Sequence, residues 1–271
     1  MTDDLETGKA TFVVNVSDQI VLEKNLLISP CFRPGHHYQI LKQENFPSAA
    51  KAYNDALEKS DNDLVIFVHQ DLILPSTWVL RLQEALRALE KTDPNWGVLG
   101  VFGRTSAGED RGYIYSTGLR LIGSPFKSPT VVQTLDEIVL IIRKSSGLRF
   151  DERLPHFHFY GAEICLAALQ KGMKSYAIPA FCIHNTQYSL VLPKEFYASY
   201  GILKSIWKKY IPVHTTCIQI TKFNSHVYRR RINEFALRYL RRKTIGAYRR
   251  EDSSRFLKEF DNSDANQYSG S

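Results

Sequence analysis

The sequence predicts an α/β fold with a mostly parallel sheet and helices on both faces. Two observations lead to this prediction. Short apolar runs alternate with segments of helical periodicity, and polar residues follow the apolar runs where strands would end. Such alternation is typical of parallel sheets, which bind ligands at the carboxyl ends of their strands. With 271 residues, 44% of them hydrophobic, the chain is long enough for one such domain and a smaller appendage.

The first two elements are a strand and a helix. Residues 11–16 are rich in β-branched side chains and predict a strand. The strand ends at Ser17 and Asp18, where a loop would contact a nucleotide. Pro47 and Ser48 then open a segment with apolar residues at helical spacing, and Ser48 is the expected N-cap.

The next strand is the clearest element of the chain. Residues 64–68 form a continuous apolar run bounded by polar residues, as in a central strand covered on both faces. His69, Gln70 and Asp71 follow directly. The sequence therefore predicts polar side chains at the carboxyl edge of the sheet.

Alternation continues along the chain. We expect a helix from Pro75, a strand within 97–103, and a long loop or hairpin over the site at 105–134. A buried strand at 138–142 and a short helix at 162–171 follow. Two further strand pieces, 176–178 and 181–184, complete the predicted sheet.

The C-terminal region differs in composition from the rest. The apolar runs that predict strands end at about residue 192, and an aromatic, basic segment that we expect to be largely helical follows. Residues 222–258 hold 12 Lys and Arg against 3 Asp and Glu, a charge of +9 within a chain of net +7. We therefore predict a main domain over 10–190, a basic helical extension over 191–261 and a disordered tail over 262–271.

Composition also excludes several classes of protein. The four cysteines form no CxxC pair, so neither a zinc knuckle nor a disulfide scaffold is indicated, and we expect buried thiols in a reducing compartment. The acidic N-terminus does not resemble a signal peptide. The longest apolar runs are far shorter than the ~20 residues of a membrane span. These features predict a cytoplasmic protein, at most peripheral at the inner face of the membrane.

Asp71 is the sharpest candidate for chemistry. A carboxylate at a strand end holds a divalent cation against a diphosphate through its oxygen atoms. The alternative is a solvated Asp in the turn before Pro75. His184 follows a strand piece as well, and imidazole there suits a metal ligand or a bond to a neighbouring backbone carbonyl.

Several runs together resemble a known family, the bacterial family 2-like glycosyltransferases. The resemblance covers about residues 12–184 and implies a GT-A fold, Rossmann-like and followed here by the basic helical segment. It rests on Asn25-Leu-Leu-Ile-Ser-Pro30, Ala50-Lys-Ala-Tyr-Asn54, Leu64-Val-Ile-Phe-Val-His-Gln-Asp71, Leu135-Asp-Glu137, Phe150-Asp-Glu152, His156-Phe-His-Phe-Tyr-Gly-Ala-Glu163 and Phe181-Cys-Ile-His184.

The resemblance implies a metal and nucleotide site. Asp71 matches the last residue of the family's Asp-x-Asp element, with His69 in place of the first Asp. Asp71 and His184 would hold Mn²⁺ or Mg²⁺. His69 would ligate the metal or hydrogen-bond the ribose. The donor nucleotide would contact His69, Asp71, Ser17, Asp18 and Asn54, although Asn54 would equally brace a loop.

A catalytic base is implied as well. Glu163 stands where related enzymes place the carboxylate that takes the acceptor's proton. The family often has an acidic pair here, whereas this chain has Gly161 and Ala162 before Glu163. Asp136 and His158 are therefore alternatives for the base. The other interpretation of Glu163 is an acidic residue that favours the start of a helix.

By this resemblance, the chain would transfer a sugar from a nucleoside-diphosphate sugar to an acceptor hydroxyl, with inversion of the anomeric configuration. A UDP-sugar is the favoured donor, and the acceptor would be a glycan, a lipid-linked molecule or another hydroxyl compound. Nucleotidyl transfer is disfavoured because residues 17–20 lack a Gly-rich, basic phosphate loop. A non-catalytic binding protein with a degenerate site remains the alternative.

The basic extension suggests a second partner. Its Lys and Arg clusters alternate with aromatic and aliphatic residues, as in an amphipathic helix at an anionic membrane surface. Nucleic acid is the less favoured partner. The alternative is a solvated face. The clusters are Arg229-Arg-Arg231, Arg241-Arg-Lys243 and Arg249-Arg250.

Overall fold

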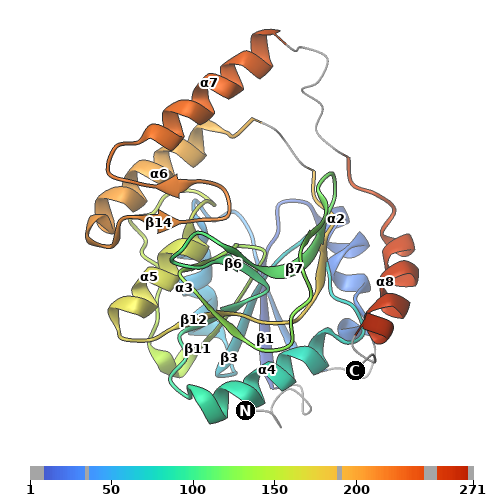
Figure 1. Cartoon of the computed structure of the whole chain (residues 1–271). Helices are drawn as coiled ribbons and strands as arrows, with labels where there is room; N and C mark the ends of the chain where they lie inside the picture. Colours follow the sequence, from blue (N-terminus) through green and yellow to red (C-terminus); the bar gives the residue numbers. More distant parts are fainter. Residues whose placement is uncertain (1–8, 34–36, 188–190, 241–248, 268–271) are drawn as a thin grey trace.

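A computed structural model describes residues 9–33, 37–187, 191–240 and 249–267. Figure 1 shows a central sheet with helices on both sides, and α7 leaning out from the body at the top. The helices are α2 (Gln19–Lys24), α3 (Ala49–Lys59), α4 (Trp78–Thr92), α5 (Tyr160–Gln170), α6 (Lys194–Ile206), α7 (Ser225–Leu240) and α8 (Ser253–Gln267), with short 3₁₀ turns at Leu26–Ile28, Pro30–Phe32, Lys144–Ser146 and Lys208–Tyr210.

The main sheet has seven strands in the order β2-β1-β3-β11-β5-β12-β9. The pairs β2–β1, β1–β3 and β5–β12 are parallel, whereas β11 and β9 run against their neighbours. The predicted mostly parallel sheet is thus confirmed, with these two strands reversed. Its strands are β1 (Ala10–Asn15), β2 (Gln39–Gln43), β3 (Leu64–His69), β5 (Val98–Gly100), β9 (Thr130–Val132), β11 (Val139–Arg143) and β12 (Ser175–Ala177).

Strand β3 shows why helices cover both faces. Its side chains alternate, as strand geometry requires. Val65 and Phe67 enter the core built with α3 and α5, whereas Ile66 and Val68 enter the core built with α2 and α4. All four are fully buried. Ser48 caps α3 as predicted, because its side chain accepts a hydrogen bond from the Lys51 N–H.

A second sheet lies beside the first. Its six strands follow the order β10-β6-β7-β13-β4, with β8 paired to β7. The segment 105–134, expected as a loop or hairpin, contains the β7–β8 hairpin of this sheet and also β9 of the main sheet. The strands are β4 (Leu72–Ile73), β6 (Phe102–Arg104), β7 (Asp110–Ser116), β8 (Arg120–Gly123), β10 (Thr134–Leu135) and β13 (Cys182–His184).

The first part of the C-terminal extension packs into the main core. Phe196, Trp207 and Ile220 are buried in the same cluster as α3 and α5, so a boundary at residue 191 does not mark a separate core. Between α6 and α7 the chain forms the 3₁₀ turn at Lys208–Tyr210 and then a small hairpin of β14 (Val213–His214) and β15 (Gln219–Ile220).

Helix α8 extends into the segment 262–271, which the sequence predicts as a tail. The helix runs to Gln267, so residues 262–267 are helical, while 268–271 lie outside the described residues. Phe256 is 1% exposed and packs on Tyr115, and these residues belong to a third apolar cluster. The basic triplet at 241–243 also lies outside the described residues.

The molecular surface carries one departure from expectation. Cys31, Cys165 and Cys182 are buried free thiols as predicted, whereas Cys217 is exposed.

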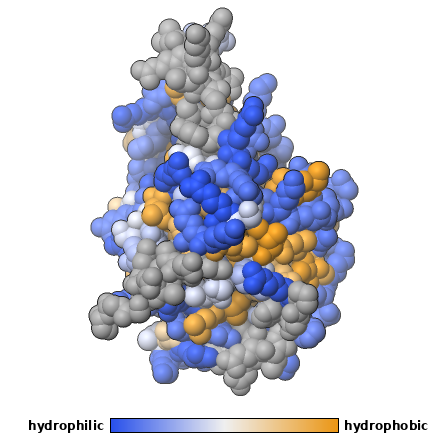
Figure 2. Space-filling view, turned by 90° about the vertical axis from the view of Figure 1, so that its right-hand side faces the viewer, coloured by the Kyte–Doolittle hydropathy of each residue, from blue (hydrophilic) through white to orange (hydrophobic). Residues whose placement is uncertain are grey.

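Viewed from the side of α8, the surface is mostly hydrophilic with a band of hydrophobic side chains (Figure 2). Among the described helices, none combines the length and the hydrophobicity needed to cross a membrane.

Candidate functional site

The register of two strands brings the predicted metal ligands together. His69 ends β3, and Asp71 lies in the turn that leads into β4. Strand β13 pairs antiparallel with β4, with His184 opposite Leu72. The Asn185 N–H donates to the Asp71 carbonyl oxygen at 2.9 Å, which extends this pairing. His184 therefore lies beside Asp71 although 113 positions separate them in the chain.

The three side chains form a compact cluster. His184 Nε2 lies 3.3 Å from Asp71 Oδ1, and His69 Nδ1 lies 4.0 Å from the same oxygen. The potential ligand atoms of all three residues lie within 4.8 Å of one another. Asp71 is only 7% exposed. A buried carboxylate between two imidazoles is an arrangement that suits a divalent cation.

Burial and neighbouring charges shift the pKa values of all three side chains in the cluster. Burial by itself would raise the pKa of Asp71, but His184, His69 and Arg250 together bring it well below its usual range. Burial opposes the charged form of His184 as well, yet the Asp71 carboxylate raises its pKa. Burial and the charge of His184 lower the pKa of His69. The Asp71 carboxylate thus favours the charged form of His184, whereas burial and His184 disfavour the charged form of His69.

The surroundings of His69 also fit a metal ligand. Its Nε2 lies 2.9 Å from the Tyr160 hydroxyl, so Nδ1 is the ring nitrogen turned toward Asp71. Metal-binding imidazoles are commonly oriented by such a hydrogen bond at the second ring nitrogen. His69, Asp71 and His184 therefore pass a test of donor chemistry and orientation.

Arg250 joins the cluster from the far end of the chain. Its Nη2 lies 3.7 Å from Asp71 Oδ2. Asn185 fixes this segment, because its Nδ2 donates to the Glu251 carbonyl at 2.9 Å and its Oδ1 accepts from the Glu251 N–H at 2.9 Å. Sequence reasoning assigned Arg250 to a surface-binding cluster, and no local pattern linked it to Asp71.

The cluster opens into a cavity of about 550 Å³, which we call the central cavity. Asp136 lies on its wall just before β11. The Asp136 Oδ2 accepts from the Thr216 hydroxyl at 2.6 Å, and Oδ1 accepts from the Ile138 N–H at 3.3 Å. The polar residues that line the cavity include His69, Asp110, Ser116, Asp136, Glu137, His158, His184, Thr186, Gln187, Thr215, Thr216 and Arg230.

Glu137 is a cavity residue that sequence reasoning missed. Burial and the neighbouring Asp136 raise its pKa well above the usual range, although N–H groups at the start of α5 oppose this shift. A Cβ atom at Gly161 would lie 2.7 Å from the Leu135 carbonyl oxygen and 3.2 Å from Glu137 Cγ. Gly161 therefore lets the first turn of α5 approach Glu137. The adjacent acidic pair at 136–137 was the available signal.

Glu163, the preferred base from the sequence, does not line the central cavity. It is 1% exposed, and its Oε2 accepts from the Asp151 N–H at 3.1 Å. Burial raises its pKa to about 8. These contacts fit the alternative of a carboxylate in the first turn of a helix. His158 does line the cavity, and burial together with His156 lowers its pKa.

The predicted nucleotide contacts separate into two groups. Asn54 braces a loop, because its Nδ2 donates to the Phe150 carbonyl and its Oδ1 accepts from the Phe150 N–H. It lines neither described cavity, and its hydrogen bonds fit the alternative that it braces a loop. Ser17 and Asp18 remain exposed at the end of β1.

Gln70 holds that exposed loop in place. The backbone N–H groups of Ser17 and Asp18 both donate to Gln70 Oε1, at 3.0 and 3.1 Å. The Asp18 carboxylate accepts from the Ile20 and Val21 N–H groups and so caps α2. Gln70, the middle residue of the His69–Asp71 triplet, thus connects the loop after β1 to the His69–Asp71–His184 cluster.

Comparison with known proteins gives a consistent picture. A family model described as a glycosyltransferase-like family matches residues 11–200. A protein of Fuscovulum blasticum described as ATP synthase subunits region ORF 6 is 31% identical over 140 residues, which cover 49% of this chain and 55% of that protein.

Two solved structures are similar. The crystal structure of GalNAc-T7 with UDP, GalNAc and Mn²⁺ aligns with a TM-score of 0.51 at 10% identity, over 96% of this chain and 58% of that one. The mannosyltransferase PcManGT from Pyrobaculum calidifontis, in complex with GDP-Man and Mn²⁺, aligns with a TM-score of 0.43 at 12% identity. The alignment covers 73% of this chain and 61% of that one. The chain spans little more than half of GalNAc-T7 and of the Fuscovulum protein.

Proposed function

The chain belongs to the glycosyltransferase-like family and has a GT-A fold, and from this premise we propose that it transfers a sugar from a nucleoside-diphosphate sugar to an acceptor hydroxyl. One observation carries the proposal. The His69–Asp71–His184 cluster and the Asp136 carboxylate belong to one continuous site around the central cavity. A leaving diphosphate and an attacking hydroxyl require this pair of features.

The metal end of the cavity would receive the diphosphate of the donor. Two imidazoles beside one carboxylate favour Mn²⁺ over Mg²⁺, which prefers ligands that are all oxygen. A bound cation neutralises charge on the departing diphosphate. Arg250 adds a fixed positive charge at the same place. We favour UDP as the nucleotide, since GalNAc-T7, which shares the fold, was solved with UDP and Mn²⁺.

Asp136 would act as the base at the acceptor end. The Thr216 hydroxyl and the Ile138 N–H hold its two oxygens in fixed positions. Burial and the neighbouring Asp136 raise the pKa of Glu137 well above its usual range, which favours Asp136 over Glu137 in this role. As Asp136 takes the proton, the acceptor oxygen attacks the anomeric carbon and the bond to the diphosphate breaks on the opposite face. This direct displacement inverts the configuration. His158 is the alternative base.

An anionic membrane surface at the cytoplasmic side is the second partner that we propose. On α7, Tyr228, Ile232, Phe235 and Tyr239 are each more than 60% exposed, and their spacing places them along one helical stripe. Basic residues at 229–231 flank the stripe. Exposed aromatic side chains next to cations are typical of helices that lie in a membrane interface.

The first experiment measures thermal stabilisation by UDP, GDP and TDP, each with and without Mn²⁺. We expect one nucleotide to stabilise the wild type only with the metal, because a ligand that binds the native state raises its stability by mass action. The variant Asp71→Asn should lose this effect. Donor hydrolysis is then followed with the matching sugar nucleotide. Metal-dependent binding without any turnover would support a non-catalytic binding protein instead.

A further inference from the structure

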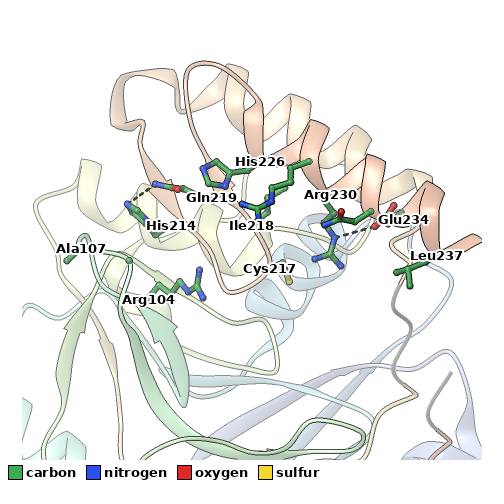
Figure 3. Close-up of a pocket in the computed structure, with 13 residues that line it drawn as sticks. Arg104, Ala107, His214, Cys217, Ile218, Gln219, His226, Arg230, Glu234 and Leu237 are labelled. Carbon is green, nitrogen blue, oxygen red and sulfur yellow. Dashed lines mark hydrogen bonds and ion pairs between the residues drawn. The ribbon is translucent and has the colours of Figure 1, made fainter. Parts of the chain in front are cut away.

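A second pocket opens next to the central cavity. Its volume is about 670 Å³, and it lies between the β6–β7 turn, the β14–β15 hairpin and α7 (Figure 3). We call it the basic pocket. Its lining residues are Arg104, Ala107, Gly108, His214, Cys217, Ile218, Gln219, His226, Arg229, Arg230, Asn233, Glu234 and Leu237.

Positive charge exceeds negative charge in this pocket. Three arginines and two histidines line it, with Glu234 as the single carboxylate among the lining residues. Glu234 is 7% exposed and already accepts hydrogen bonds from Arg230 and the Leu192 N–H. Arg104 is paired with Asp110 at 2.6 Å, whereas Arg229 has no ion pair among the described residues. Arg104 and Arg230 thus have one carboxylate partner each, and the charge of Arg229 is available to a ligand.

The wall that carries His214 is held from several sides. The His214 N–H donates to Gln133 Oε1 at 2.8 Å, and the Thr134 hydroxyl donates to the His214 carbonyl. Gly108 has a φ of +81°, and a Cβ atom there would lie 2.8 Å from His214 Nδ1. Glycine thus permits the imidazole to pack against the β6–β7 turn. Burial, Arg104 and His226 all lower the pKa of His214.

The basic pocket adjoins the proposed catalytic base. Cys217 and Arg230 line both the basic pocket and the central cavity. Figure 3 shows Cys217 between Arg104, which rises from the sheet, and Arg230, which descends from α7. Thr216, the residue before Cys217, donates its hydroxyl hydrogen bond to Asp136. A group of the acceptor that binds in the basic pocket would therefore lie close to the hydroxyl that reacts at Asp136.

Resting on the proposed glycosyl transfer, we propose that the basic pocket binds a phosphate group of the acceptor. Arginine guanidinium groups match phosphate oxygens through paired N–H donors, and three arginines line this pocket together with two histidines. The proposal assigns the enzyme a phosphate-bearing acceptor, either a soluble sugar or polyol phosphate or the phosphate of a lipid.

The test measures binding of inorganic phosphate to the full chain by calorimetry. We expect Arg229→Gln and Arg104→Gln each to weaken the affinity about tenfold, the effect of losing one charge-assisted contact of about 1.4 kcal/mol. The matched control is Arg231→Gln on the same helix. Arg231 lies 4.7 Å from the ring centre of Tyr197 and lines neither cavity. Equal affinity in all three variants would overturn the proposal, because phosphate would then respond to net charge alone.

The source of the phosphate is resolved by competition. Glycerol 3-phosphate and short-chain phosphatidic acid are titrated against bound inorganic phosphate, and the tighter competitor identifies a soluble or a lipid-borne acceptor. Failure of both to compete would overturn the assignment of an acceptor site.

The donor site is tested separately on the same samples. Binding of UDP with Mn²⁺ should be retained in Arg104→Gln and Arg229→Gln. Absence of nucleotide binding in the wild type would contradict the proposed glycosyl transfer while leaving the phosphate measurement interpretable.

Discussion

The floor and the rim of the central cavity are built in different ways. The floor consists of residues at strand ends or next to them, namely His69, Asp71, Asp136 and His184. The rim comes from the C-terminal part of the chain, through Thr216 and Arg230, and Arg250 of the same part lies 3.7 Å from Asp71. Strand register fixes the floor, whereas only packing of distant segments fixes the rim. We therefore expect substitutions on the floor to affect chemistry most strongly, and those on the rim to change affinity.

The largest effect is expected for the base on the floor. Asp136→Asn should lower turnover by about 10²–10⁴-fold, the usual contribution of a general base, without loss of UDP–Mn²⁺ binding. The measurement is steady-state transfer or donor hydrolysis.

Two variants serve as comparisons for this prediction. Glu163→Gln should retain activity, because Glu163 does not reach the cavity. A large loss in His158→Gln, with Asp136→Asn near wild type, would assign the base to His158.

The second effect concerns the metal ligand. Asp71→Asn should reduce turnover on the order of 10²–10³-fold, as expected when a group that stabilises developing charge is removed. Calorimetry with Mn²⁺ and UDP measures the accompanying loss of metal-dependent binding. The thermal melting curve confirms that the variant folds, and His184→Gln provides an independent second ligand variant. Wild-type metal dependence in both would contradict the assigned site.

A smaller effect is expected at the rim. Arg250→Gln should weaken binding of the nucleoside diphosphate about tenfold, or about 1.4 kcal/mol, because one positive charge near the diphosphate is lost. The control is Arg255→Gln, a nearby residue that pairs with Glu259 on the exposed side of α8. Equal affinities in the two variants would show that Arg250 acts only by packing.

The smallest effect on activity is expected for substitution of Glu163, which should instead change the free energy of unfolding. Its pKa rises from 4.5 to about 8 in the folded protein, so the folded state binds the proton more tightly than the unfolded state. Its contribution to stability is complete below pH 4.5 and is lost as the pH rises through 8.

Glu163→Gln mimics the protonated carboxyl and should remove this dependence. Between pH 5 and 8, the wild type should lose on the order of 1–3 kcal/mol more unfolding free energy than the variant. Denaturant melts at several pH values provide the measurement. Parallel curves for the two proteins would mean that Glu163 is ionised when folded.

The floor of the site was largely predictable. Residues 64–68 had to be a buried strand, and His69 and Asp71 therefore had to lie at its carboxyl edge. The candidates Asp71 and His184 meet as expected, although the pairing of β13 with β4 could not be known. The acidic pair at 136–137 is visible in the sequence. The proposal of Asp136 rather than Glu163 as the base, however, depends on which carboxylate lines the cavity.

The sequence by itself determined the alternation of elements, the two apolar faces of β3 and the polar residues at strand ends, because local periodicity follows from backbone geometry. Tertiary structure alone decided that Asn54 braces Phe150, that Glu163 is buried beside Asp151, and that Arg250 reaches Asp71. These contacts join segments 12 to 179 positions apart. No local pattern encodes them, because their geometry depends on how whole helices and strands pack together.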